Sequence, residues 1–550
     1  MRKFFYFTIL SSLITFPNIL TAQSSAKEKG LESITMDAIK GPLEFLASDW
    51  TEGRETGEPG SFMAADYIQS MFKVYGIKPA GDDFIKWPTR AERSAGKKPQ
   101  TLKSFFQDFN LIKFKAGKNQ VFQLKRKDGA NKYTQSFEYR TDFSFGSTEI
   151  SQSFDAEVVF AGYGYKDEPN NYNDYKNIDV EGKIILILSG FPGHKDKNSE
   201  AYKKFSNNTN RSPYYLSRSK RNWAEAEGAL GIIEYSSEYK PQDSWADNYP
   251  LRYDSRGYEG DKPMRTREYS MRAIGDELNP SLLRITVSNR LVNEIIKNSK
   301  VDFDSYEQAA MNKMKPASVP IPNLSIHVYA DIESKIIKTR NVLGMIEGED
   351  LNDIIVTGGH YDHLGIKKGF IFNGADDDAS GVIGMMTIAR AIKASGKKPK
   401  RTIIFAAWTG EEKGLLGSRH FVKNFKPLDR LSYNLNMDMI SRNNSNDKKG
   451  NQLTMKVTKG NDFFEQLTTQ NIENFKLDLE VKYNKIAPGT QSGGSDYVPF
   501  CAEYIPFFSF NAGFDPNYHH YDDEVSNLNW KKMLEIVKLG YLNIWDLANY

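Results

Sequence analysis

DIIVTGGHYDHLGIKKGFIFNGADDDASGVIG, residues 353–384, is the stretch that decides the fold of this chain. The apolar run at residues 354–356 predicts a buried strand. Gly358 and Gly359 follow it, and we expect them to let the backbone turn sharply at the strand's carboxyl end. Side chains of the types that bind metals come directly after this turn: His360, Asp362 and His363.

A second polar loop, residues 374–381, lies later in the same stretch. It carries three successive carboxylates, Asp376 to Asp378, and leads into an apolar pattern of helical spacing that begins at Val382. Adjacent carboxylates repel one another, so an uncompensated cluster would be unfavourable. We expect a divalent cation to compensate for their charge.

The overall composition excludes several classes of protein. At 550 residues the chain is too long for one core of ordinary size, so two or three domains are expected. Lys and Arg (73) nearly balance Asp and Glu (70), which gives no reason to expect nucleic acid or an anionic membrane as a partner. No internal run reaches membrane-spanning length. The oligomeric state does not follow from the sequence.

Cysteine and histidine usage restricts the metal chemistry. The single cysteine, Cys501, excludes an intramolecular disulfide and a thiolate zinc cluster, so metal ligands must be His, Asp or Glu. Most of the histidines fall after residue 350: His360, His363, His420, His519 and His520. The chemistry is therefore expected in the C-terminal third.

The amino terminus has the pattern of an export signal. Arg2 and Lys3 precede an apolar run that ends near Leu20, and residues 20–22 offer a cleavage site before Gln23, although Leu20 is larger than the residue usual at its position. A membrane anchor is the weaker alternative, because the run is short and broken by a proline. The mature protein is predicted to work in the periplasm or outside the cell, with no membrane association beyond export.

The region before residue 320 divides by composition. Residues 48–57 are rich in charge and are predicted to form a solvated loop between two helices. Near residue 150 the pattern changes to short β runs with glycine turns, which indicates a separate small domain. The excursion at residues 236–279 is poor in aliphatic side chains and is either a wall of a substrate cleft or a plain surface loop.

Two further apolar strands end in ionisable residues. Residues 402–408 lead to Glu411 and Glu412, and residues 433–437 lead to Asp438. Open α/β sheets place their ligand sites at the carboxyl ends of strands, so we expect one cleft with the composition of a two-metal site. Imidazoles and carboxylates suit Zn²⁺, with Mn²⁺ or Co²⁺ as alternatives. Taken singly, each acidic group could equally be a solvated loop or helix start.

The ordered motifs resemble those of the co-catalytic dizinc aminopeptidases, a group that includes aminopeptidase Y, bacterial leucyl aminopeptidase and glutamate carboxypeptidase II. The motifs are, in order, HYDHLG at 360–365, GADDDASG at 374–381, EEKGLLGS at 411–418, NMD at 436–438 and YH at 518–519. The resemblance implies an α/β fold of the zinc-exopeptidase type, with a mixed sheet flanked by helices and an inserted β-rich protease-associated domain. It implies four parts: 1–22 signal peptide, 23–149 first part of the peptidase domain, 150–318 inserted domain and 319–550 metal-binding part.

The resemblance also implies roles for individual residues. Two zinc ions per chain would be held by five ligands, with Asp377 shared between them: His360, Asp377, Glu412, Asp438 and His519. Glu411 would be the general base acting on a metal-bound water, and Asp362 would orient His360. Tyr518 occupies the position where some members stabilise the oxyanion. His519 is chosen over His520 because the family's His is followed four residues later by Asp. His363 and His420 are predicted to be surface residues or neighbours of ligands.

These features predict a secreted or periplasmic dizinc aminopeptidase acting on peptides. A carboxypeptidase or dipeptidase resembling glutamate carboxypeptidase is the alternative, and it would need an arginine-lined pocket, for which Arg340, Arg419 and Arg442 are available. Less favoured alternatives are a glutaminyl cyclase and a receptor-like relative that has lost its metals.

Overall fold

A computed structural model describes residues 26–146, 148–209, 213–236, 269–278, 282–367 and 369–550. The predicted signal peptide and residues 237–268 of the excursion lie outside the described residues. Within the described ranges, none of the helices combines the length and apolar character needed to cross a membrane.

The chain divides into two compact units. The first comprises Met1–Phe109 and Lys338–Tyr550, and the second comprises Asn110–Ile337. The boundaries expected for the inserted domain, 150 and 318, both fall inside the second unit and stay a prediction. Strands β4 (Phe106–Ala116) and β16 (Ile332–Ile346) carry the chain from one unit to the other.

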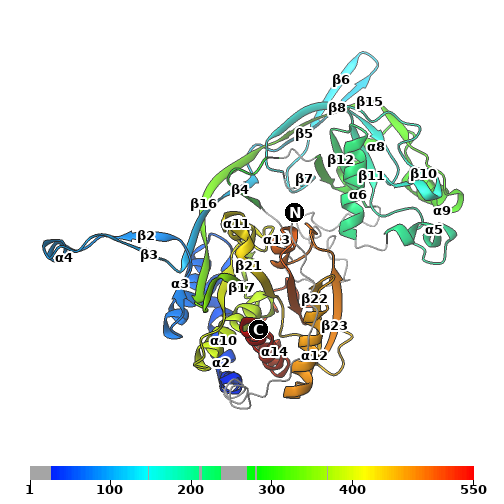
Figure 1. The fold of residues 1–550 in the computed structure, drawn as a ribbon. Helices are drawn as coiled ribbons and strands as arrows, with labels where there is room; N and C mark the ends of the chain where they lie inside the picture. The colour runs from blue at the N-terminus through cyan, green and yellow to red at the C-terminus, as the bar shows by residue number, and fades with distance from the viewer. Residues whose placement is uncertain (1–25, 147, 210–212, 237–268, 279–281, 368) are drawn as a thin grey trace. The chain divides into compact units, whose positions relative to one another are not determined.

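A mixed sheet forms the centre of the first unit, in the order β16-β20-β17-β21-β24-β22-β23 (Figure 1). Besides β16, its strands are β17 Asp350–His360, β20 Arg401–Trp408, β21 Leu431–Met437, β22 Gln452–Thr458, β23 Glu480–Ile486 and β24 Phe507–Asn511. The short strand β1 (Lys78–Pro79) pairs with β16. Strand β17 is parallel to both of its neighbours, β20 and β21. The carboxyl ends of these three strands therefore meet at one edge. The predicted strands at 354–356, 402–408 and 433–437 are confirmed.

Helices cover both faces of this sheet (Figure 1). Ile355 of β17 packs into a large cluster with residues of α3, α10 and α14, whereas Ile354 and Val356 pack on the opposite face with residues of α11 and α13. Burial on both faces explains why the strand is a continuous apolar run. The helices are α2 Met36–Leu46, α3 Pro59–Val74, α10 Gly381–Ala394, α11 Leu416–Asn424, α12 Phe463–Phe475, α13 Tyr497–Ala502 and α14 Trp530–Asn549. Short elements complete the unit: η1 Asp49–Arg54, β2 Asp83–Lys86, α4 Arg90–Ser94, β3 Gln100–Lys103, β18 Gly365–Lys367, β19 Phe370–Phe372, η3 Ala375–Ser380, η4 Leu428–Arg430 and η5 Val525–Asn527.

Gly358 and Gly359 make no turn, contrary to the sequence prediction. Both lie inside β17, which continues to His360. A Cβ at Gly359 would approach a carboxylate oxygen of Asp378 to 2.7 Å, and one at Gly358 would approach the carbonyl oxygen of Ala406 to 2.5 Å. Glycine is needed here for close packing against the neighbouring strand and loop.

The second unit is built on its own sheet, in the order β6-β5-β15-β8-β11-β12-β14-β7. The strands are β5 Val121–Asp128, β6 Asn131–Ser136, β7 Phe143–Phe145, β8 Gln152–Phe160, β11 Ile184–Leu188, β12 Gly231–Tyr235, β14 Leu283–Val287 and β15 Val319–Ala330. Strands β8, β11, β12 and β14 form a parallel ladder. The remaining elements are β9 Lys166–Asp167, η2 Glu168–Asn170, β10 Tyr172–Asn173, α5 Glu200–Thr209, α6 Pro213–Ala226, β13 Tyr269–Ala273, α8 Asn289–Ile296 and α9 Phe303–Lys313.

Candidate metal centre

Three neighbouring strands deliver ionisable side chains to one edge of the first unit's sheet. His360 is the last residue of β17, Glu411 and Glu412 follow the end of β20, and Asp438 follows the end of β21. Asp377 comes from η3, the loop that precedes α10. Of these side chains, Glu411 is the most accessible, at 14% exposed.

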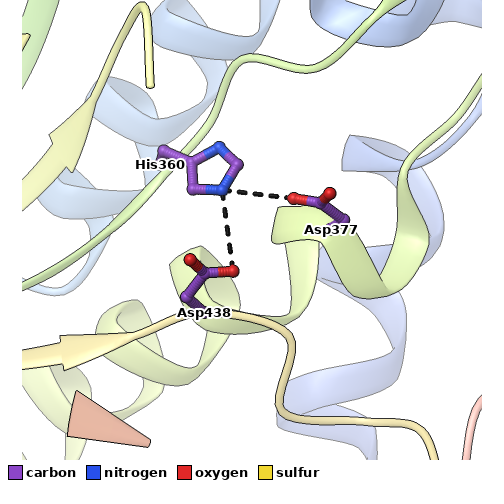
Figure 2. A group of neighbouring side chains, drawn as sticks. All are labelled: His360, Asp377 and Asp438. Carbon is purple, nitrogen blue, oxygen red and sulfur yellow. Dashed lines mark ion pairs between the residues drawn. The ribbon is translucent and has the colours of Figure 1, made fainter. Parts of the chain in front are cut away.

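The first group of metal-binding side chains consists of His360, Asp377 and Asp438 (Figure 2). The Nε2 atom of His360 lies 3.2 Å from Oδ1 of Asp377 and 3.8 Å from Oδ1 of Asp438. Burial tends to lower the pKa of His360, but the charge of Glu411 and the contacts with Asp377 and Asp438 raise it well above its ordinary value. The surroundings of this imidazole are therefore strongly anionic.

The second group uses the other oxygen of Asp377. The Nε2 atom of His519 lies 3.0 Å from Oδ2 of Asp377 and 3.1 Å from Oε1 of Glu412. The Nδ1 atom of His363 lies 3.1 Å from the same Glu412 oxygen and 3.9 Å from Oδ2 of Asp377. His363, Asp377 and Glu412 together could hold a cation. The structure thus brings two imidazoles to this side of Asp377, where the sequence analysis assigned only His519.

Zinc fits this arrangement of donors. A tetrahedral ion with bonds of about 2.0–2.2 Å holds neighbouring ligand atoms about 3.3–3.6 Å apart, close to the separations found around Asp377. His363 is fully buried; apart from the contact of its Nδ1 atom with Glu412, neither of its ring nitrogens makes a hydrogen bond to the described residues. Buried polar atoms without partners are rare in folded proteins unless a ligand or ion satisfies them.

The three adjacent aspartates point to different partners. Asp376 accepts hydrogen bonds from the backbone N–H and the hydroxyl of Ser441, and burial raises its pKa to about 8. Asp378 accepts from the backbone N–H groups of His360, Gly381 and Met439. Only Asp377 of the three belongs to the metal-binding groups. A compensating cation, as predicted from the sequence, would therefore bind at Asp377, whereas Oδ1 of Asp376 and the carboxylate of Asp378 accept hydrogen bonds from protein donors.

Glu411 and Asp362 lie beside His360. The carboxylate of Glu411 comes within 3.9 Å of Nε2 of His360, and its backbone N–H donates to Oδ1 of Asp362. Burial raises the pKa of Glu411 well above its ordinary value. The backbone carbonyl of Asp362, 3.0 Å from Nδ1 of His360, is at hydrogen-bond distance, whereas its carboxylate is 3.8 Å away. The ring is thus oriented chiefly by the main chain of Asp362.

The remaining histidine and tyrosine candidates occupy different surroundings. The ring of Tyr518 stacks on that of His519, with centroids 3.7 Å apart. The ring of His420 stacks on Phe109 in the same manner, at 4.2 Å. His420 belongs to neither metal-binding group, whereas His363 is buried beside Glu412, so that of the two roles predicted for His363 the surface one does not apply.

Residues 48–57, predicted as a solvated loop, are instead partly buried against the loops that carry the candidate metal ligands. Arg54 is fully buried and bonds four backbone carbonyls: those of Leu46, Tyr361, Asn373 and Gly374. The hydroxyl of Thr56 donates to Oδ2 of Asp362 at 2.9 Å. The charge of this segment suggested exposure to solvent, but the guanidinium of Arg54 satisfies the carbonyl that follows His360 and two carbonyls that precede Asp377.

Arg442 and Asp523 support the loop that carries Asp377, a role that was not predicted from the sequence. Asp523 accepts from the backbone N–H groups of Asp376 and Asp377, each at 3.0 Å. Arg442 donates to Asp523 at 2.7 Å and to Asp515 at 2.6 Å and is buried. The position of Asp523 four residues after His519 was the available signal. No signal in the sequence pointed to Arg442 as a structural residue.

Known proteins resemble this chain in sequence and in fold. Residues 341–541 match the family model described as peptidase family M28. A glutamate carboxypeptidase 2 homolog of Caenorhabditis elegans is 29% identical over 331 residues, which cover 53% of this chain and 38% of that protein. Leucine aminopeptidase 2 of Trichophyton rubrum is 32% identical over 217 residues, which cover 35% of this chain and 41% of that protein. The chain therefore spans about four-tenths of the length of these curated relatives.

The solved structure titled aminopeptidase from Aneurinibacillus sp. strain AM-1 aligns with a TM-score of 0.54. The alignment covers 95% of this chain and 96% of that chain at 18% identity. The expected α/β fold, a mixed sheet flanked by helices, and the resemblance to the co-catalytic aminopeptidase group are thereby confirmed, while the inserted protease-associated domain stays a prediction.

Proposed function

We propose that this chain, whose residues 341–541 match peptidase family M28, is a zinc-dependent aminopeptidase that removes residues from the amino ends of peptides. One observation carries the proposal: the two oxygens of Asp377 face two separate groups of imidazole and carboxylate donors. A carboxylate shared in this way is what holds two cations close together in co-catalytic sites.

The proposed ligands divide into two sets around Asp377. His360 and Asp438 hold one ion, and Glu412 and His519 hold the other. We favour His519 over His363 because its Nε2 atom is nearly equidistant from the oxygens of Asp377 and Glu412, whereas His363 lies 3.9 Å from Asp377. Zinc bound at these positions would polarise the substrate carbonyl and make a water molecule a stronger nucleophile.

Glu411 is proposed as the general base, and its position supports this role. It follows β20 beside a proposed ligand, yet it belongs to neither metal-binding group. Its carboxylate accepts a proton from the attacking water and gives it to the amine that leaves when the peptide C–N bond breaks. Tyr518, stacked on His519, is proposed to stabilise the oxyanion, and Asp362 to fix the orientation of His360 through its carbonyl.

The surroundings of the arginines support the aminopeptidase direction. A carboxypeptidase needs a cation for the substrate carboxylate. Arg442 is bound to Asp515 and Asp523, and Arg340 bonds Asp108 at 3.0 Å and lies over the ring of Phe106. Arg419 donates to the carbonyl of Gly414. Among the described residues, Arg340 and Arg442 are thus already paired with carboxylates.

Blocked peptides test the direction of attack. Acetylating the amino end of a tripeptide should abolish hydrolysis, whereas amidating its carboxyl end should change kcat/KM little. Preferential hydrolysis of the acetylated peptide would instead identify a carboxypeptidase, the alternative that the glutamate carboxypeptidase 2 homolog suggests.

Two broader features belong to the same proposal. We propose export by residues 1–22, to the periplasm or the medium. We also propose that residues 150–318 form a protease-associated domain, an interpretation supported by the parallel ladder of β8, β11, β12 and β14 within one compact unit.

A further inference from the structure

A two-stranded arm extends from the first unit. Strands β2 and β3 pair antiparallel, from Asp83 opposite Lys103 to Lys86 opposite Gln100, and the short helix α4 lies in the connection between them. In Figure 1 the arm projects away from the helices of its own unit. Every residue of both strands is exposed. Because an isolated hairpin of this length is only marginally stable in water, the full exposure of both strands needs a physical explanation.

Apolar side chains lie on both faces of the arm. Phe84 is paired with Leu102, and Ile85 is paired with Thr101. Because side chains alternate along a strand, Phe84 and Leu102 project from one face and Ile85 from the other. Trp87, which follows β2, is 68% exposed, and Ile85 is 56% exposed. A ribbon with exposed apolar groups on both faces suits a surrounding that can enclose it from both sides.

The arm also concentrates positive charge. Residues 83–103 contain six basic residues and two acidic ones, a net charge of +4, whereas the whole chain carries only +3. Lys97 is paired with Glu92 and Lys103 with Asp83. The other four basic residues of the arm have no ion-pair partner in the described part of the chain: Lys86, Arg90, Arg93 and Lys98. The balanced total for the whole chain hides this local excess.

The base of the arm is held firmly. The backbone of Gly81 donates to Ser104, and a Cβ at Gly81 would meet the carbonyl oxygen of Phe106 at 2.2 Å. The backbone carbonyl of Leu343 in β16 accepts a hydrogen bond from the N–H of Ala80, and the N–H of Leu343 donates to the carbonyl of Phe105. Ala80 and Phe105 each lie one residue beyond the pair Gly81 and Ser104. The arm is therefore fixed to the central sheet at both ends and is not a loosely attached loop.

We propose that this arm, residues 83–103, docks the protein on an anionic phospholipid surface. Trp, Phe and Ile enter the boundary between headgroups and acyl chains, while Lys and Arg extend their charged ends to the phosphates. A fluid interface encloses both faces of a thin ribbon, whereas a folded protein partner would cover one. The concentrated positive charge selects anionic headgroups.

Flotation with vesicles tests the proposal on the full chain. The protein should float with vesicles of equal parts phosphatidylglycerol and phosphatidylcholine at low salt, and not with pure phosphatidylcholine. Raising the salt should release it, because exposed charges are screened. The triple variant Arg90→Ser, Arg93→Ser, Lys98→Ser should bind about 100-fold more weakly, since each basic residue near such a surface strengthens binding about fivefold. The double variant Phe84→Ser, Trp87→Ser should bind about tenfold more weakly.

A matched control distinguishes the effect of the charge on the arm from that of the total charge of the chain. Lys398, Lys448 and Lys449 are exposed lysines of the same unit outside the arm, and changing all three to Ser removes the same charge. This control should bind vesicles like the wild type, and all variants should keep the wild-type melting temperature. Equal loss in the control, or no flotation with anionic vesicles, would refute the proposal. Self-association that the Phe84→Ser, Trp87→Ser variant abolishes would refute it too, by identifying a second copy as the occupant.

Discussion

Two buried aspartates, Asp174 in the second unit and Asp377 in the first, show that the same residue type can either stabilise a core or form part of a candidate ion site. Asp174 accepts hydrogen bonds from the backbone N–H groups of Tyr163 and Tyr165, both at 3.0 Å. It also accepts from the hydroxyls of Tyr172 at 3.0 Å and Tyr306 at 3.1 Å. Both of its oxygens thus have neutral donors, as expected of a polar group that holds a core together.

Asp377 has a different environment. Its backbone N–H donates to Asp523, whereas its side chain faces imidazoles and lies near the carboxylate of Glu412. Burial and the charge of Glu412 oppose its ionisation, but hydrogen bonds from His360 and His519 lower its pKa below the ordinary value. Buried charges of like sign held close together, beside a buried imidazole whose Nε2 atom has no hydrogen bond to the described residues, indicate a candidate ion site.

The largest effect should separate Glu411, the proposed general base, from Asp174. Glu411→Gln should lower kcat by about 10²–10⁴, because a positioned general base is lost, while zinc content and melting temperature stay unchanged. Asp174→Asn should leave kcat at the wild-type value. Steady-state kinetics and metal analysis on both variants check this, and near-normal turnover in Glu411→Gln would remove it from the mechanism.

The buried arginine beside the metal loops should affect stability most. Arg54→Ala leaves four carbonyls without their donor and should lower the free energy of unfolding by about 3–5 kcal/mol. Arg126 is the matched control, since it also donates to backbone carbonyls, those of Glu294 and Lys297, but near the surface of the second unit. Arg126→Ala should cost about 1 kcal/mol or less. Urea denaturation of the two variants makes the comparison, and equal losses would show that Arg54 has no special role.

A smaller effect concerns pH. Burial raises the pKa of Asp174 from 3.8 to about 6 in the folded state, so the folded protein binds this proton more tightly than the unfolded chain. The stability contributed by Asp174 therefore rises as pH falls through about 6 to about 4, by about 3 kcal/mol in all. Asn does not titrate. Relative to Asp174→Asn, the wild type should therefore gain that amount of unfolding free energy when the pH is lowered from about 7 to about 4. A difference between the two proteins that does not change with pH would contradict the burial argument.

Much of the fold followed from apolar runs and from the ionisable residues at their ends. Strands at 354–356, 402–408 and 433–437 were predictable because strands buried on both faces leave a continuous apolar signal. Parallel pairing then places their carboxyl ends together. These three strands could be predicted from the local sequence alone, because here the local pattern and the tertiary structure agree.

The residues that support the metal loops were not predictable in this way. Arg54 and Thr56 lie in a segment whose charge is typical of a solvent-exposed loop. Their burial depends on acceptors from distant loops, such as the carbonyl of Tyr361 and the carboxylate of Asp362. The sequence could not tell which of three adjacent aspartates faces the imidazoles, because this depends on backbone geometry. It also could not show that His363 is buried beside Glu412.

Zinc content per chain tests the central claim most directly. The purified wild-type protein should bind two zinc ions, and removing them should lower its melting temperature, because metal binding favours the folded state. His519→Ala should retain one ion, whereas His363→Ala, which removes the neighbouring imidazole, should retain both. A folded wild-type chain that binds no zinc, or binds only one ion at saturation, would contradict the account.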